Sequence, residues 1–192
     1  MKKIAIAALL SSFVAAPAFA ADEGLYAGVT LGTARTGTVL PAGGMTKSSD
    51  TVLGILGGYQ FTKNWGIEGF YTGAGKWALG TAANGASGKA DAWGISGVGT
   101  LPVSDAFSVY GKLGYASTKT KATGVAAGVA GDMSATRGAI TYGLGGVYNV
   151  NQSVGIRFGW DRYAAATVNG TAVGVKDNYN SNVYSLGAVF KF

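Results

Sequence analysis

Cysteine and histidine are both absent from this 192-residue sequence, and only 12% of its residues are charged. Without cysteine there is no disulfide framework and no thiolate metal site. Without histidine the chain lacks the usual general base of hydrolytic and acyl-transfer enzymes, and no serine has a lysine or acid partner suggested by spacing. We therefore expect no catalytic residues, no bound metal and no cofactor.

The sequence also lacks a long apolar run beyond its N-terminal region. No stretch of about 18 apolar residues, the length expected of a transmembrane helix, occurs in residues 21–192. Yet 48% of the chain is hydrophobic and it contains 33 glycines, whereas ordinary globular proteins carry about 25% charged residues. A soluble protein this poor in charge would struggle to cover its surface, whereas lipid would cover the outside of a membrane β-barrel.

Residues 1–20 have the pattern of a secretory signal peptide. Two lysines follow the first methionine, an apolar stretch comes next, and Ala18 and Ala20 form the small-x-small pattern read by signal peptidase. The apolar stretch is shorter than the roughly 20 residues that a membrane-spanning helix needs. We predict cleavage after Ala20, which leaves residues 21–192 as one domain.

The remaining chain alternates between two kinds of side chain, as a strand with two different faces requires. The last segment shows one face with Asn182, Tyr184, Leu186, Ala188, Phe190 and Phe192, and the other with Ser181, Val183, Ser185, Gly187, Val189 and Lys191. Residues 154–161 and 108–115 repeat the pattern, with Arg157 and Asp161 on the face opposite Phe158 and Trp160, and Lys112 on the face opposite Leu113 and Tyr115. This is the rhythm of a strand that faces lipid on one side and a narrow interior on the other.

The alternation divides the chain into eight segments, which are residues 24–35, 50–61, 65–76, 89–101, 107–118, 136–148, 154–166 and 180–192. Short connections (62–64, 102–106 and 149–153) alternate with long ones (36–49, 77–88, 119–135 and 167–179). Short periplasmic turns and long external loops are typical of outer-membrane barrels, and a soluble β-sandwich has no reason to sort its loops in this way. We predict an all-β fold, an eight-stranded antiparallel up-and-down transmembrane β-barrel.

Several stretches resemble the OmpA/OmpX-like eight-stranded outer-membrane proteins, a family that includes opacity-type surface antigens. They are Gly58-Tyr59-Gln60-Phe61-Thr62, Gly66-Ile67-Glu68-Gly69-Phe70-Tyr71, Lys112-Leu113-Gly114-Tyr115 and the segment 155–163. The C-terminal ending, with Gly187, Phe190 and Phe192, looks like the signal read by the barrel-assembly machinery. The resemblance implies a barrel-only member of the bacterial outer membrane, without the peptidoglycan-binding domain of full-length OmpA.

The same resemblance implies the partners of the chain. These are outer-membrane lipid and lipopolysaccharide, the barrel-assembly machinery, and host surface molecules that would meet the loops. We expect a monomer with no nucleic-acid partner.

Four charged residues are predicted to meet inside the barrel. Glu68 and Arg157 each lie about four residues beyond a short turn and share inward parity, Lys112 lies a little higher, and Asp161 lies above Arg157. Eight strands enclose a space just wide enough for side chains, and buried charges are costly unless they are paired and hydrogen-bonded. We predict an interior plug of these four residues, with Gln60, Thr72 and Tyr110 as polar neighbours.

The resemblance bears on this plug as well. Glu68 and Arg157 match positions of the charged lumen network of OmpA-like barrels, whereas Val98 and Tyr148 stand where its other members would be expected. A static structural network is therefore favoured over a gating switch that works by exchange of ion pairs.

Two function classes remain open. One is a structural and surface-interaction barrel that presents four external loops for envelope integrity or adhesion, and the other is a low-conductance pore or transporter of small solutes. The basic residues assigned to the loops or their borders are Lys47, Lys76, Lys89, Lys119, Lys121, Arg137 and Lys176. We favour solvated caps over a binding surface for host molecules or lipopolysaccharide phosphates, because loop composition does not encode a ligand.

Overall fold

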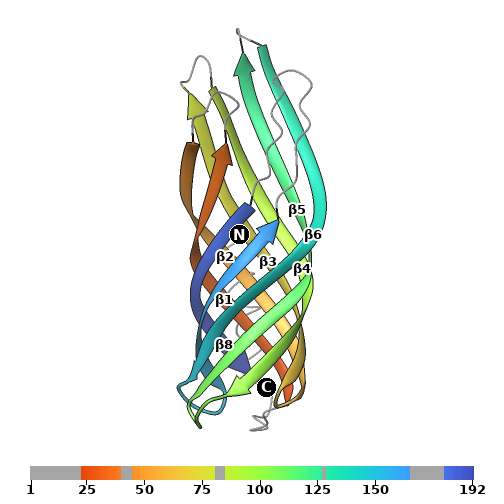
Figure 1. The fold of residues 1–192 in the computed structure, drawn as a ribbon, viewed down its shortest axis with the longest axis vertical. Helices are drawn as coiled ribbons and strands as arrows, with labels where there is room; N and C mark the ends of the chain where they lie inside the picture. The colour runs from red at the N-terminus through yellow and green to blue at the C-terminus, as the bar shows by residue number, and fades with distance from the viewer. Residues whose placement is uncertain (1–22, 40–44, 81–84, 127–128, 165–179) are drawn as a thin grey trace, which may run out of the picture.

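The computed structural model describes residues 23–39, 45–80, 85–126, 129–164 and 180–192. They form one closed barrel in which every strand pairs antiparallel with its neighbours in the sequence, and β1 pairs with β8 (Figure 1). The strands are β1 (Gly24–Val39), β2 (Met45–Thr62), β3 (Trp65–Gly80), β4 (Gly85–Pro102), β5 (Phe107–Ala126), β6 (Val129–Asn149), β7 (Val154–Ala164) and β8 (Asn180–Lys191). No helix among the described residues is long and apolar enough to cross a membrane. The predicted eight-stranded antiparallel barrel is confirmed.

The large apolar side chains point outward. Leu113, Trp93 and Leu31 are 64%, 60% and 59% exposed, and the two residues that flank each of them in its strand are buried or partly buried. An exposed apolar band of this kind is stable only where lipid replaces water around it. The barrel therefore has an apolar outer surface and buried charged side chains, the reverse of a soluble protein, as the alternation predicts.

The short turns are closed by side-chain hydrogen bonds. Thr62 Oγ1 accepts from the backbone N–H groups of Asn64 and Trp65 at 3.3 and 3.1 Å. Asn151 Oδ1 accepts from the N–H groups of Ser153 and Val154 at 2.9 and 2.8 Å. Such local bonds satisfy the backbone where the ladder of the sheet stops, which is why threonine and asparagine suit these turns.

The predicted extent of the long loops was wrong. Strand pairing continues to Val39↔Met45, Gly80↔Gly85 and Ala126↔Val129, so most of 36–49, 77–88 and 119–135 is hairpin rather than loop. The fourth connection, 167–179, lies outside the described residues. The physical reason is that a hairpin above the membrane has water on both faces, so its sequence carries no apolar alternation even though its backbone is fully paired.

The described strands differ in length. β7 and β8 have 11 and 12 residues, whereas β5 and β6 have 20 and 21. Among the described residues β6 pairs with β7 from Asn149↔Gly155 to Thr141↔Tyr163, and the β5–β6 hairpin rises above the described part of β7 and β8, drawn in blue in Figure 1. The longest described strands are therefore the neighbours β5 and β6.

Candidate functional site

A buried ion pair crosses the lumen between β3 and β7. Arg157 Nη1 lies 2.5 Å from Glu68 Oε2, and Arg157 Nη2 lies 3.1 Å from Glu68 Oε1. The Glu68 side chain is completely inaccessible, and Arg157 is 6% exposed. Two parallel N–H···O bonds between a guanidinium and a carboxylate are the strongest pairing available to these groups.

Lys112 of β5 joins this pair to a second carboxylate. Its Nζ lies 3.5 Å from Glu68 Oε1 and 2.9 Å from Asp161 Oδ1, where the contact is an ion pair without hydrogen-bond alignment. The same ammonium lies 5.3 Å from the ring centroid of Phe70. Two cations and two anions thus form one contiguous group with no net charge, which is the condition under which buried charges are tolerated.

Two tyrosines add hydrogen bonds to Glu68 and Arg157 of this group. Tyr26 donates its hydroxyl to Glu68 Oε2 at 3.1 Å. Arg157 Nε donates to the Tyr110 hydroxyl at 2.9 Å, and that hydroxyl donates to the carbonyl oxygen of Phe158 at 3.3 Å. These six residues, Tyr26, Glu68, Lys112, Tyr110, Arg157 and Asp161, are called the lumen network below.

Sequence reasoning named five of the six and missed Tyr26. Gly58 pairs in register with both Tyr26 and Glu68, so the missing side chain of Gly58 leaves the room that the Tyr26 ring occupies. A register count across β1 and β2 was the signal that could have found it. The other two predicted polar neighbours, Gln60 and Thr72, do not take part. Thr72 donates to the carbonyl oxygen of Gly73, and among the described residues neither side chain hydrogen-bonds to the four charged side chains.

A second layer, of apolar side chains, lies on the hairpin side of the lumen network. It consists of Ala34, Val52, Ala92, Ala116, Tyr163 and Val183, with Phe70 packed against them. The rings of Phe70 and Tyr163 lie 5.8 Å apart. The alternation assigns these side chains to the inner face but does not show that they pack together as a layer.

Two cavities adjoin the lumen network on different sides. A cavity of about 490 Å³ lies at the short-turn end, and Tyr26, Tyr110 and Arg157 are among its lining residues. A void of about 30 Å³, the volume of one or two waters, is lined by network residues together with Phe70 and Tyr163. Ser96, buried beside Glu68 in register on β4, has no hydrogen-bond partner for its hydroxyl among the described residues.

Comparison with known proteins shows the family to which the chain belongs. The outer membrane protein β-barrel domain matches residues 6–192. The chain belongs to this outer-membrane β-barrel family. Its place is the bacterial outer membrane, as the sequence predicts.

Solved structures share the fold of this family member at low sequence identity. Ail, the attachment invasion locus protein of Yersinia pestis, in complex with the heparin analogue sucrose octasulfate, is 16% identical with a TM-score of 0.59, covering 88% of this chain and 99% of that one. Neisserial surface protein A is 18% identical with a TM-score of 0.60 (88% and 97% covered). OprG of Pseudomonas aeruginosa is 18% identical with a TM-score of 0.57 (90% and 98% covered). No curated protein sequence matches the chain.

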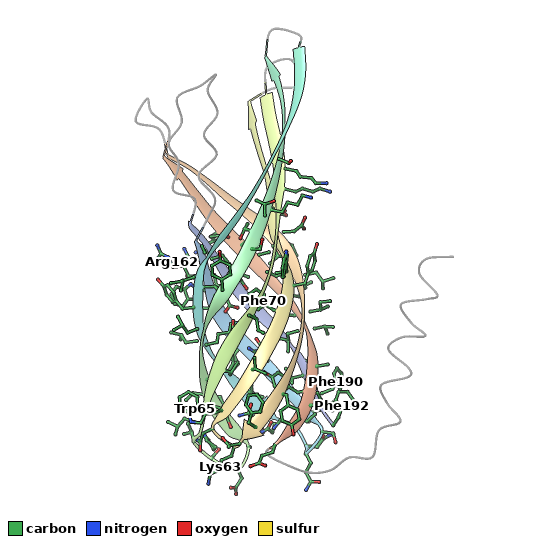
Figure 2. All side chains as sticks on the ribbon, turned by 90° about the vertical axis from the view of Figure 1, so that its right-hand side faces the viewer. Lys63, Trp65, Phe70, Arg162, Phe190 and Phe192 are labelled. Atoms are coloured by element: carbon green, nitrogen blue, oxygen red, sulfur yellow. The ribbon has the colours of Figure 1, made fainter. Side chains whose placement is uncertain are left out.

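The predicted assembly residues of this family member lie in or beside β8. Gly187 faces inward between Thr30 and Arg157 in register. Phe190 is 39% exposed on the outer wall, and the backbone N–H of Phe192 donates to the carbonyl oxygen of Leu25 at 2.9 Å. Figure 2 shows both phenylalanines at the same lower side of the barrel. Their role in assembly stays a prediction, and the predicted cleavage residues Ala18 and Ala20 lie outside the described residues.

Basic residues assigned to loops or their borders lie instead in strands, except Lys176, which falls outside the described residues. Lys89 of β4 and Lys121 of β5 are exposed and directly opposite one another. Lys119, two residues before Lys121, is exposed and pairs in register with Asp91. We call Lys89, Lys119 and Lys121 the lysine surface, and it lies on β4 and β5.

Proposed function

We propose that this family member is a closed, non-enzymatic outer-membrane barrel whose activity is interaction at the cell surface through its tall hairpins. The observation that supports a closed barrel is that two successive layers of side chains fill the lumen. The ionized lumen network and the apolar layer follow one another along the axis, and the void between them holds about 30 Å³. A path for hydrated ions needs a continuous aqueous channel, which eight strands are too few to leave open.

The absence of enzyme activity is part of the proposal. The chain has no histidine, and both lumen carboxylates, Glu68 and Asp161, are engaged by cations. A general base must be free to take a proton from a substrate. These paired carboxylates, far inside a filled barrel, do not meet that condition.

The lysine surface supports interaction with an anionic partner. Lys89 and Lys121 face each other directly across two strands, and like charges in that position repel one another. A polyanion bound over both would remove the repulsion. We propose a sulfated polysaccharide of a host surface as the partner, and the Ail structure with a heparin analogue shows that this fold can carry such a ligand.

The first test is electrical. The full chain, expressed and processed in a bacterial outer membrane, is purified and inserted into planar bilayers. We expect no reproducible ion conductance. A steady current from the unmodified protein would overturn the closed barrel and favour the alternative, a low-conductance pore or transporter of small solutes.

The second test is binding of heparin, measured by calorimetry on the purified protein in detergent. We expect the double substitution Lys119→Gln and Lys121→Gln to weaken binding, and salt to weaken it further because exposed charges are screened. The matched control, Lys63→Gln with Lys191→Gln, removes the same charge at the short-turn end, where Figure 2 shows Lys63. Equal binding by both variants and the unmodified protein would overturn the assignment of the lysine surface.

A further inference from the structure

We propose that Arg35, Asn182 and Arg162 form a binding site, on the outer wall of the barrel, for the phosphate group of an outer-leaflet lipid. The proposal rests on the orientation used in the proposed function, in which the hairpins extend away from the cell. It concerns a different surface from the lysine surface.

The three residues lie in one row across three adjacent strands. Arg35 of β1 pairs in register with Asn182 of β8, and Asn182 pairs with Arg162 of β7. Neighbouring strands are about 4.8 Å apart, so the two arginine Cα atoms are about 10 Å apart with Asn182 between them. All three share outward parity with the exposed Leu31, Tyr184 and Phe158 of their own strands.

Aromatic residues contact the row on its short-turn side. Arg35 Cζ lies 5.7 Å from the ring centroid of Tyr184, and Trp160 Nε1 donates to Asn182 Oδ1 at 3.2 Å. The Tyr142 ring meets Trp160 edge-on at 5.9 Å. Because the Asn182 carbonyl oxygen accepts from the indole, its amide N–H₂ group is left to donate on the other side. The row thus offers two guanidinium groups and one amide donor.

The ends of the row carry no opposing charge. Arg35 pairs in register with Ser49 on its other side, and Arg162 pairs with Tyr142. The row Ser49–Arg35–Asn182–Arg162–Tyr142 therefore crosses five strands without a carboxylate. Guanidinium groups bind phosphate oxygens in a planar, bidentate manner, so two of them flanking an amide donor suit a phosphate.

The height of the row identifies lipid as the source of that phosphate. Aromatic belts mark the headgroup level of a membrane, and Asn182 is two residues, about 7 Å along the strand, beyond Tyr184. On β4, Lys89 is four residues, about 13 Å, beyond Trp93. Arg162 and Asn182 each lie two residues from the end of the described part of β7 and β8, on the side away from the short turns. Figure 2 shows Arg162 at this upper level and Trp65 at the opposite end.

The test counts lipids bound to the whole protein. The purified protein in neutral detergent is titrated with phosphatidic acid, a lipid that carries a phosphate monoester, and bound lipid is measured by native mass spectrometry. We expect the double substitution Arg35→Gln and Arg162→Gln to weaken binding by roughly ten- to thirty-fold. The matched variant Lys119→Gln with Lys121→Gln removes the same charge and should leave lipid binding unchanged.

Two further arms separate the alternatives. Inorganic phosphate, added as a competitor at equal phosphate concentration, should not displace the lipid. Arg35→Lys with Arg162→Lys, which keeps the charge but not the bidentate geometry, should show intermediate affinity and also covers the case in which the glutamine variant fails to fold. Equal weakening by the arginine and lysine-surface glutamine variants, no weakening by the arginine variants, or displacement by inorganic phosphate would each overturn the proposal.

The outcome is independent of the other tests. Failure of heparin to bind, or appearance of a current, would count against the proposed function and leave the phosphatidic acid titration unaffected. Loss of lipid binding in the arginine variant with heparin binding intact would assign the two anionic ligands to two separate surfaces.

Discussion

Arg157 and Glu68 are joined by two hydrogen bonds although 89 residues separate them in the sequence. Their strands, β7 and β3, are not neighbours in the barrel, so the pair connects two walls that share no backbone hydrogen bonds. A charged brace of this kind stabilises the barrel only as long as both partners are present, because a buried charge left alone is costly.

Loss of the Glu68 carboxylate should therefore be expensive. We expect Glu68→Gln to lower the free energy of unfolding by about 3–5 kcal/mol, because it leaves Arg157 and Lys112 with one carboxylate between them. Urea unfolding in phospholipid vesicles, followed by tryptophan fluorescence, measures the change. Asp105→Asn, in an exposed turn, is the control and should be neutral. A Glu68→Gln variant as stable as the control would show that the pair does not brace the barrel.

Opening the lumen should require both layers to be removed. We expect Glu68→Ala alone to remain non-conducting, because Phe70 and Tyr163 still fill the lumen above it. Adding Phe70→Ala and Tyr163→Ala should produce a small ion current in planar bilayers. A current from Glu68→Ala alone would mean that the apolar layer does not seal the barrel.

Two glycines on one strand should differ in their tolerance of a methyl group. A Cβ at Gly114 would collide with the backbone carbonyl of Ile95 and with Ser96, whereas a Cβ at Gly111 would meet nothing within 4 Å. We expect Gly114→Ala to destabilise the barrel by about 1–3 kcal/mol through overpacking and Gly111→Ala to be neutral. Urea midpoints of the two variants measure this, and equal midpoints would contradict it.

The C-terminal phenylalanines should matter for assembly more than for stability. We expect Phe190→Ala with Phe192→Ala to reduce the amount of folded, heat-modifiable protein in the outer membrane of expressing cells. The exposed Phe61 supplies the control, and Phe61→Ala should assemble normally. If the double variant accumulates like the control, the predicted assembly signal lies elsewhere.

Processing should remove the N-terminal region. We expect N-terminal sequencing of the protein from the outer membrane to begin at Ala21, because Ala18 and Ala20 form the recognition pattern of signal peptidase. Ala18→Arg should slow processing and leave precursor on gels. A protein that keeps Met1 in the outer membrane would contradict this prediction.

Much of the fold could be predicted because lipid imposes a simple rule on each strand. In β8 the alternation from Ser181 to Phe192 assigned an inner and an outer face that the exposures of Val183 and Tyr184 reproduce. Alternation is no longer required in the parts of a strand that extend beyond the lipid. Hence β5 was expected to stop at 118 but continues to Ala126, through residues that have no reason to alternate.

The part of the candidate site that could be predicted is the part that follows from two quantities: the distance of each residue from its short turn and the face of the strand on which it lies. Glu68, Arg157, Lys112 and Asp161 were expected to meet because their distances from the short turns can be counted. Tyr26 was missed because its contact with Glu68 depends on two successive strand registers. The register also shifts between Gln60 and Thr62 and between Gly73 and Gly75, and no residue count along one strand reveals such a shift.

The sequence by itself determined the number of strands, the face that each side chain takes and the signs of the charges sent inside, because these follow from contact with lipid, strand by strand. Only the closed tertiary structure decided the length of the paired hairpins, the apolar layer above the lumen network and the alignment of Arg35, Asn182 and Arg162. These features depend on pairing between strands, and closure joins β1 to β8 across almost the whole length of the chain.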